Sequence, residues 1–468
     1  MAARFVNIDR NTPMFLPPDL RDWLPENHIV HFIIDAVGQL NLNSFKINNR
    51  GSGSEQYPPS MMLVLLIYCY ATGRFSSRAI ESATYSDVAV RYICGGEQHP
   101  DHDTICTFRR ENGMLFSECF VKVLALAGEL GCLRKVGGIS VDGTKIKADA
   151  SKHAAVSYKR AGEMIQQLEL EVEELMRKAE DADAVSLEDG LSVPEEIGRR
   201  EDRKKQLEQA RKVIEERFRE KERGSYNAKL AERKKKKNNG QNKLGPPPKP
   251  PEEKSPGDKA QYNFTDPESR IMKAGNGKHF EQSFNAQAAV DTEGSYLVLG
   301  NGVTNHPNDK QELGPTVESV DETVRTVSDV SADTGYYSEE AITELESDNG
   351  PTAYVAVEKR SHHKSVKDLE KNSDPPEPTE DAGMKEKMGH RLKTKQGKEK
   401  YKLRKQTVEP VFGIIKEILG FRHFHLRGLD KARLEWDIVT TAYNFKRLFK
   451  MTNGIVMSEN GFLRAVNG

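Results

Sequence analysis

Apolar residues recur at helical spacing over residues 1–130, which predicts several short helices in this part of the chain. The most apolar stretch, 61–71, follows two prolines and predicts a buried helix. It is far too short to span a membrane. A second helical pattern covers 157–222 and is interrupted between Gly190 and Pro194. This interruption predicts a long antiparallel helical hairpin.

Strand-like patterns begin abruptly after the first helical region. They predict strands at 137–150, at 328–332 and at 352–357, and a β-hairpin from Phe284 to Gly300 that turns at Glu293 and Gly294. Helical spacing returns over 309–324, over 401–420 and over 430–450. A capping box at Ser338 predicts the start of another helix. The polar residues 361–398 read as a loop.

The order of these elements indicates a fold class. Without residues 151–275 the order is β-β-β-α-β-α-β-α, which is that of an RNase H-like fold. We therefore expect an α/β catalytic core with an N-terminal all-helical domain and an inserted helical hairpin arm. The expected divisions are a helical domain at 1–130, a catalytic domain from 131–150 and 276–450, a hairpin at 151–232, a basic, proline-rich linker at 233–275 and a tail at 451–468.

The charge of the chain is close to balanced overall but strongly segregated. Its 468 residues carry a formal net charge of −1. Residues 201–243 nevertheless hold sixteen Lys and Arg against eight Asp and Glu, and 384–416 hold eleven against three. Such basic stretches attract a phosphate backbone, and the alternative is a solvated helix face with a flexible tail.

The five cysteines indicate a reducing compartment. Their number is odd and none is spaced as CxxC, so we expect small buried residues and neither disulfides nor a zinc site. The first residues also lack the apolar core of a signal peptide. The sequence predicts a cytoplasmic protein.

Three acids follow or lie near predicted element ends and form the candidate chemistry. Asp142 and Asp333 each come directly after an apolar strand pattern, and Glu409 lies among basic residues. Adjacent strand ends of a sheet are neighbours, so Asp142 and Asp333 are expected to meet. Oxygen-only ligands favour Mg²⁺, whereas His or Cys ligands would favour zinc.

Each acid taken alone has a simpler interpretation. An Asp after a strand usually begins a turn, and a Glu among lysines is usually a surface ion pair. We leave Asp291 and Asp309 outside the site, because the first ends a hairpin strand and the second resembles a helix cap.

Together the motifs carry a family resemblance. The segments YPPSMMLVLLIYCYATGRFSSRAIE, HDTICTFRR, VDGTKIKADAS, SADTGYYSEEAI and YKLRKQTVEPVFGIIK resemble the DDE transposases of bacterial insertion sequences. The resemblance implies Asp142, Asp333 and Glu409 as catalytic metal ligands, with Mg²⁺ as cofactor and Mn²⁺ as its substitute. It implies DNA cleavage at transposon ends and strand transfer into target DNA, by a protein at the bacterial nucleoid.

The resemblance also suggests which residues contact double-stranded DNA. The family places a Tyr, an Arg, a Glu and a Lys on one helix, and these match Tyr401, Arg404, Glu409 and Lys416. The spacing from Arg404 to Glu409 is one residue longer than the commonest pattern. Because the next residue is Pro410, we expect the helix either to start there or to kink there.

Other candidates for DNA contact lie outside that helix. Arg109 and Arg110 end a predicted short helix, and Lys145 lies three residues after Asp142. For Lys145 a solvated lysine is an alternative, for Tyr401 a core tyrosine, and Trp436 is interpreted as core. Short helices with arginines are common, so on the residues alone a plain helical domain competes with a DNA-binding one.

Two other functions compete with a transposase. One is a metal-dependent nuclease on the same fold, and the other is a catalytically inactive DNA-binding relative or a scaffold. Because transposition pairs two DNA ends, we also expect a homodimer on DNA, for which the apolar stripe of the 157–222 hairpin offers a surface.

Overall fold

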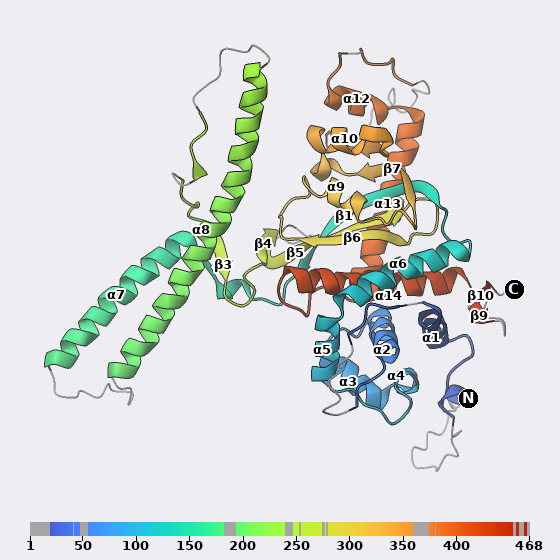
Figure 1. Ribbon diagram of the computed structural model, residues 1–468, viewed down its shortest axis with the longest axis horizontal. Helices are drawn as coiled ribbons and strands as arrows, with labels where there is room; N and C mark the ends of the chain where they lie inside the picture. The colour runs from blue at the N-terminus through green and yellow to red at the C-terminus, as the bar shows by residue number, and fades with distance from the viewer. Residues whose placement is uncertain are drawn as a thin grey trace, which may run out of the picture. The chain divides into compact units, whose positions relative to one another are not determined.

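The computed structural model describes residues 19–40, 42–46, 55–181, 193–238, 247–251, 254–273, 277, 279–358, 374–379, 381–452, 455–457 and 463–465 (Figure 1). The chain divides into two compact units. The first comprises Met1–Ile146 and Phe284–Gly468, and the second comprises Lys147–Ser283.

The N-terminal part of the first unit is helical, as the periodicity predicts. Its elements are η1 (Leu20–Trp23), α1 (Ile29–Gln39), α2 (Pro59–Ala71), α3 (Ser77–Ser86), α4 (Val88–Ile93), α5 (His102–Glu111) and α6 (Gly113–Glu129). Helix α2 begins at a proline, whose missing N–H costs nothing in the first turn of a helix. Every residue from Met62 to Ala71 is buried, which confirms the buried helix. For α5 the cap is Asp101, which accepts a hydrogen bond from Thr104 N at 2.6 Å; Asp103 lies inside the helix.

These helices share a core with the C-terminal helix α14 (Leu429–Met451). In Figure 1, α14 lies between the strands of the first unit and helices α1 to α5. The rings of Phe32 and Phe445 contact each other with centroids 6.2 Å apart, and Lys446 Nζ donates to the carbonyl of Ala71 at 2.9 Å. Trp436 is fully buried, as expected. The expected helical domain 1–130 is therefore not separate, because it packs on an element from the other end of the chain.

A buried ion pair fixes this packing and corrects one expectation. The side chain of Arg109 is 2% exposed and lies 3.6 Å from the fully buried carboxylate of Glu435. Its Nη1 donates to Tyr70 Oη at 2.7 Å and to the carbonyl of Phe75 at 2.9 Å, and Tyr70 donates to Glu435 at 2.8 Å. Arg109 was expected to contact DNA, but a guanidinium in this position serves the core.

The central sheet of the first unit is mixed. Its strands are β1 (Val136–Lys147), β5 (Phe280–Asp291), β6 (Val298–Thr304), β7 (Thr326–Ala332) and β8 (Thr352–Val355), and β5 crosses the boundary between the units. Strand β1 lies between β5 and β7; β6 pairs antiparallel with β5, and β7 pairs parallel with β1 and with β8. The predicted hairpin and the three other predicted strands are confirmed.

Short helices connect the later strands. They are α9 (Leu313–Glu318), η4 (Thr334–Tyr336), α10 (Glu339–Leu345), η5 (Ser347–Asn349) and α12 (Met384–Arg391). The Ser338 cap of α10 is confirmed, since its hydroxyl accepts from Ala341 N at 3.5 Å. Helix α9 is shorter than the 309–324 pattern. The expected loop 361–398 is wrong over α12, and residues 359–373 lie outside the described residues.

Helix α13 (Lys395–Gly413) does not start at Pro410, which was one of the two expected arrangements. The helix begins well before this proline and runs through it into a π-helical turn, η6 (Ile414–Ile418). Pro410 has no N–H to give to the preceding turn. The wider turn that follows is closed by Leu419 N, which donates to Ile414 O at 2.9 Å. The proline is thus accommodated inside the helix, and Glu409 is a helical residue, not a cap.

The second unit contains the predicted hairpin. Its elements are η2 (Lys152–Ala154), β2 (Ala155–Ser157), α7 (Tyr158–Asp181), α8 (Val193–Asn238), β3 (Gln261–Asn263) and β4 (Arg270–Lys273). Strand β3 pairs with β2, and β4 pairs with the first residues of β5. The expected linker 233–275 is therefore wrong in part, because α8 extends to Asn238 and two strands follow.

The apolar stripe of the hairpin is used within the chain. Val156, Ala161, Ile165, Leu207 and Ala210 form one buried cluster, against which Tyr262 and Phe264 pack. Leu170 and Met176 on α7, which do not belong to this cluster, are exposed.

Near the C-terminus, β9 (Ile455–Met457) pairs antiparallel with β10 (Leu463–Ala465), so the expected tail contains a small hairpin. Among the described residues, no helix combines the length and the apolar character needed to cross a membrane.

Candidate active site

The register between β1 and β7 brings Asp142 and Asp333 together. Ser140 on β1 pairs with Ser331 on β7, and the two Oγ atoms are 3.0 Å apart. Each acid lies two residues beyond its serine. Because side chains alternate along a strand, Asp142 points to the same face as Ser140. The expected meeting of these two acids is supported by this pairing, although β1 continues past Asp142 to Lys147 and does not end there.

Helix α13 covers this face and carries Glu409 to it. Thr407 Oγ1 donates to Ser140 Oγ at 2.8 Å, which fixes the helix on the strand. One turn earlier, Arg404 donates from Nη1 to Asp142 Oδ2 at 3.1 Å and from Nη2 to Glu409 Oε1 at 3.0 Å. The structure therefore links the first and third predicted acids through one guanidinium. The role of Thr407 was not predicted, because a threonine within a helix carries no sequence signal.

Burial dominates the electrostatics of Asp142. It raises the pKa of this carboxyl to about 7, with further increases from the charges of Asp333 and Asp309. The Arg404 guanidinium and the N–H of Gly143 act in the opposite direction. Burial and the two neighbouring carboxylates thus oppose the ionisation of Asp142, and a bound divalent cation would favour it.

A further acid, Asp309, which the sequence analysis left outside the site, lies beside these residues. Its Oδ1 accepts from Asn285 Nδ2 at 2.6 Å, Gln287 Nε2 at 2.9 Å and Lys145 Nζ at 3.3 Å. It caps no helix: α9 starts after Glu312, whose side chain makes no capping bond. Three donors from β1 and β5 hold the carboxylate of Asp309 at the sheet.

Gly143 has no side chain and therefore leaves room for the side chains of Asp309 and Gln287 beside β1. A Cβ atom at this position would lie 2.5 Å from Gln287 Nε2 and 2.7 Å from Asp309 Oδ1. Real Cβ atoms do not come so close to other atoms. The glycine after Asp142 is therefore explained by the crowded polar group beside it and not by a turn.

The predicted DNA-binding residues differ in how they are exposed. Arg110 is exposed, whereas Lys145, Lys416 and Tyr401 are partly buried. Lys416 donates to Thr144 and to the carbonyl of Lys145, and burial lowers the pKa of both lysines. Arg404, 8% exposed and paired with two acids, can reach a phosphate only by releasing them.

A row of exposed lysines on α13 was not singled out from the sequence. Lys395, Lys398, Lys402 and Lys405 recur at helical spacing on the exposed side of the helix that carries Arg404 and Glu409. None of the ion pairs found within the described ranges involves these four side chains. The excess of positive charge over 384–416 indicates basic residues in this region. Only the helix shows which of them lie together on its exposed side.

The donors at this site fit a hard divalent cation in their chemistry. Asp142, Asp333 and Glu409 offer carboxylate oxygens only, which are the ligands that such a cation prefers. As they stand, however, no three His, Cys, Asp or Glu side chains among the described residues converge closely enough to hold an ion. Part of the reason that the acids do not converge is the ion pair between Arg404 and Glu409, whose side chain is 48% exposed.

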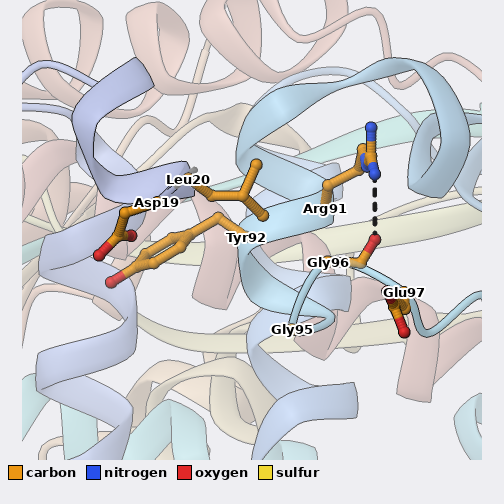
Figure 2. Close-up of a pocket in the computed structure, with 7 residues that line it drawn as sticks. All are labelled: Asp19, Leu20, Arg91, Tyr92, Gly95, Gly96 and Glu97. Carbon is orange, nitrogen blue, oxygen red and sulfur yellow. Dashed lines mark hydrogen bonds between the residues drawn. The ribbon is translucent and has the colours of Figure 1, made fainter. Parts of the chain in front are cut away.

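A pocket elsewhere in the first unit contains none of the predicted site residues. Figure 2 shows it between η1 and the end of α4, lined by residues that include Leu20, Tyr92 and Glu97. Arg91 Nη2 closes one side by donating to the carbonyl of Gly96 at 3.3 Å. The acids of the sheet are therefore the stronger candidate for chemistry.

Two known families match parts of the chain. A family described as "Transposase DDE domain" matches residues 251–445, and one described as "Transposase domain (DUF772)" matches residues 18–111. The first match includes Asp309, Asp333 and Glu409, whereas Asp142 lies outside both. No curated protein and no solved structure matches the chain significantly.

Proposed function

Given that the chain belongs to the DDE transposases, which are polynucleotidyl transferases that bind and move DNA, we propose that Asp142, Asp333 and Glu409 are its catalytic acids. They would cleave DNA at the transposon ends and join those ends to target DNA. The observation that supports this proposal is the pairing of Ser140 with Ser331, since Asp142 lies two residues after Ser140 on β1 and Asp333 comes directly after β7.

The sheet supports an RNase H-like core. Three strands, β1, β5 and β6, come first along this part of the chain, with β5 between the other two, and β7 and β8 extend the sheet in parallel on the other side of β1. Asp142 lies on the central strand of this arrangement. Asp333 follows the neighbouring strand, and Glu409 lies on the helix that packs over both.

Mg²⁺ is the proposed cofactor, and Asp142, Asp333 and Glu409 are the residues that would hold it. When bound, divalent ions activate the attacking oxygen and stabilise the leaving oxygen of an in-line displacement on phosphate. Arg404 would exchange its carboxylate partners for a DNA phosphate, because its planar guanidinium suits both. Lys145, Lys416 and Tyr401 border the same group and would position the DNA strand.

The exposed face of α13 is the proposed path of the DNA backbone towards the acids. Replacing Lys402 and Lys405 together by alanine removes two charges from this face. Each phosphate contact contributes about 0.9 to the slope of log affinity against log salt, so the slope should fall by about 2. Fluorescence anisotropy with a labelled duplex at several salt concentrations measures it.

The matched control replaces Lys431 and Lys450, two exposed lysines of α14, by alanine. This variant makes the same change in net charge away from α13. An equal loss of slope in both variants would contradict a specific path along α13 and indicate a diffuse charge effect.

Strand transfer separates a transposase from a nuclease on the same fold. A labelled duplex with a pre-cut transposon end is incubated with the protein, Mg²⁺ and a supercoiled target plasmid. Labelled plasmid products support the proposal. Hydrolysis of both substrates without joining would support the nuclease instead, and binding without either reaction would indicate an inactive relative.

A homodimer on the paired ends completes the proposal, since two ends require two active sites. Sedimentation of the complex with end DNA measures it directly. A complex containing one chain only would contradict this part.

A further inference from the structure

Several hydrogen bonds hold the carboxylate of Asp309 beside the other acids. Its Oδ1 takes three donors, from Asn285, Gln287 and Lys145. Its Oδ2 takes none of the hydrogen bonds found among the described residues. That atom lies 3.7 Å from the position of a Cβ on Gly335, where Asp333 Oδ1 lies at 3.0 Å. The free oxygen of Asp309 therefore faces the side on which Asp333 lies.

A second, independent feature is a buried acceptor that lacks a donor. Asn285 is fully buried, and its Oδ1 has no hydrogen-bond partner. The orientation of its amide is fixed, because Nδ2 donates both to Asp309 Oδ1 and to the carbonyl of His306 at 3.2 Å. An unpaired buried acceptor costs about 1–3 kcal/mol.

The position of this oxygen suggests what would satisfy it. Asn285 Oδ1 lies 3.1 Å from the place where Gly143 would carry a Cβ, directly after Asp142. An amide oxygen and several carboxylate oxygens together form the ligand type of a hard divalent cation. The amide is thus an unused oxygen donor beside the acids already proposed as ligands.

We propose that Asp309 is a fourth carboxylate of the catalytic centre and contributes to holding the divalent cation alongside Asp142 and Asp333. Asn285 and Gln287 present this carboxylate, and Asn285 offers its free amide oxygen to the same centre. This inference rests on the proposed function, because it adds a residue to the metal site assigned there.

The competing explanation is that Asp309 only positions Lys145. The two side chains form an ion pair at 3.3 Å, so loss of either would then have the same effect. The variant Lys145→Met removes the pair and leaves the carboxylate. It therefore separates a residue that holds the cation from one that acts through the lysine.

The experiment measures binding of Mn²⁺ to the full chain without DNA, by electron paramagnetic resonance. Asp309→Asn keeps the size of the side chain and its ability to accept hydrogen bonds, and it should weaken Mn²⁺ binding by about 10- to 100-fold. Asp142→Asn should weaken it at least as much. Asp202→Asn, a control at an exposed acid on α8, should bind as the wild type does. Lys145→Met removes a positive charge beside Asp309, so it should bind Mn²⁺ at least as tightly as the wild type.

The outcomes distinguish this inference from the proposed function. Wild-type affinity in Asp309→Asn with a loss in Asp142→Asn overturns the inference and leaves the proposed function standing. Wild-type affinity in both variants contradicts the metal site itself. Equal losses in Asp309→Asn and Lys145→Met overturn the direct role of Asp309.

A second measurement uses the unmodified protein, in case Asp309→Asn does not fold. Fe²⁺ in place of Mn²⁺, with ascorbate and peroxide, generates hydroxyl radicals that cut the backbone near the bound ion. Cuts near residues 142, 309 and 333 support the proposal. Cuts near 142 and 333 without any near 309 overturn it.

Discussion

Replacement of Asp142 or Asp333 by asparagine is expected to slow cleavage of transposon-end DNA by at least about 1,000-fold. The metal-ion contribution to charge stabilisation in phosphoryl transfer amounts to several kcal/mol, and about 4 kcal/mol corresponds to this factor. Asparagine preserves the shape of each side chain but offers one neutral oxygen in place of a carboxylate. Single-turnover cleavage of a labelled duplex with saturating protein measures the chemical step apart from binding.

The same variants should keep their affinity for DNA, because both changes remove negative charge near the phosphates. Affinity within a few fold of the wild type, together with the loss of cleavage, assigns the acids to chemistry. The exposed acid Asp202 provides the control, and Asp202→Asn should cleave normally. Cleavage by Asp142→Asn at the wild-type rate would contradict the assignment of β1 to the active site.

Replacement of Arg109 by methionine is expected to lower the free energy of unfolding by about 3–5 kcal/mol. The change leaves the carboxylate of Glu435 buried without its guanidinium and removes the donor to Tyr70 and to the carbonyl of Phe75. Urea unfolding followed by circular dichroism measures the loss. Because this network joins α5 and α2 to α14, unfolding of the N-terminal helices should remain coupled to that of α14.

Two further variants make the Arg109 result specific. Arg110→Met, at the exposed neighbour in the same helix, should change stability by no more than about 0.5 kcal/mol. Adding Glu435→Gln to Arg109→Met should recover part of the loss, since no unpaired charge remains. An Arg109→Met protein as stable as the wild type, but weak in DNA binding, would restore the original interpretation of Arg109 as a DNA contact.

The sequence predicts the strands and the three acids because these rest on local patterns. Apolar runs with β-branched residues identify β1 and β7, and recognising an acid after each run requires no knowledge of distant contacts. The expected sheet makes these two strands neighbours, but only the structure gives the register that pairs Ser140 with Ser331. What the sequence does not contain is the position of Arg404 between Asp142 and Glu409, because side-chain pairing depends on how α13 lies over the strands.

Asp309 and Arg109 both have contacts that local sequence patterns do not reveal. Asp309 follows Pro and Asn in a polar stretch, so its side chain is interpreted as a cap. The pairing of β5 with β6, which sets Asn285 opposite Thr304, brings Asn285 and Gln287 to it. Arg109 ends a short amphipathic helix and reads as exposed. Its partner Glu435 lies more than 300 positions away, where no local pattern could reveal it.

Part of 233–275 is folded differently from what its composition predicts. Lysines, asparagines and prolines predict a linker, but lysine is a good helix former and α8 continues through the lysines to Asn238. Strands β3 and β4 are three and four residues long. They are strands because they pair with β2 and β5, and their own short sequences do not predict this pairing.

Cleavage of a duplex carrying the element's own ends, by the wild-type protein and by Asp142→Asn, tests the central claim most directly. Cuts at the ends that require Mg²⁺ or Mn²⁺, disappear with EDTA and are lost in Asp142→Asn are the predicted result. Cutting that is independent of the ends, or that persists in Asp142→Asn, would contradict a transposase active site built on Asp142 and Asp333.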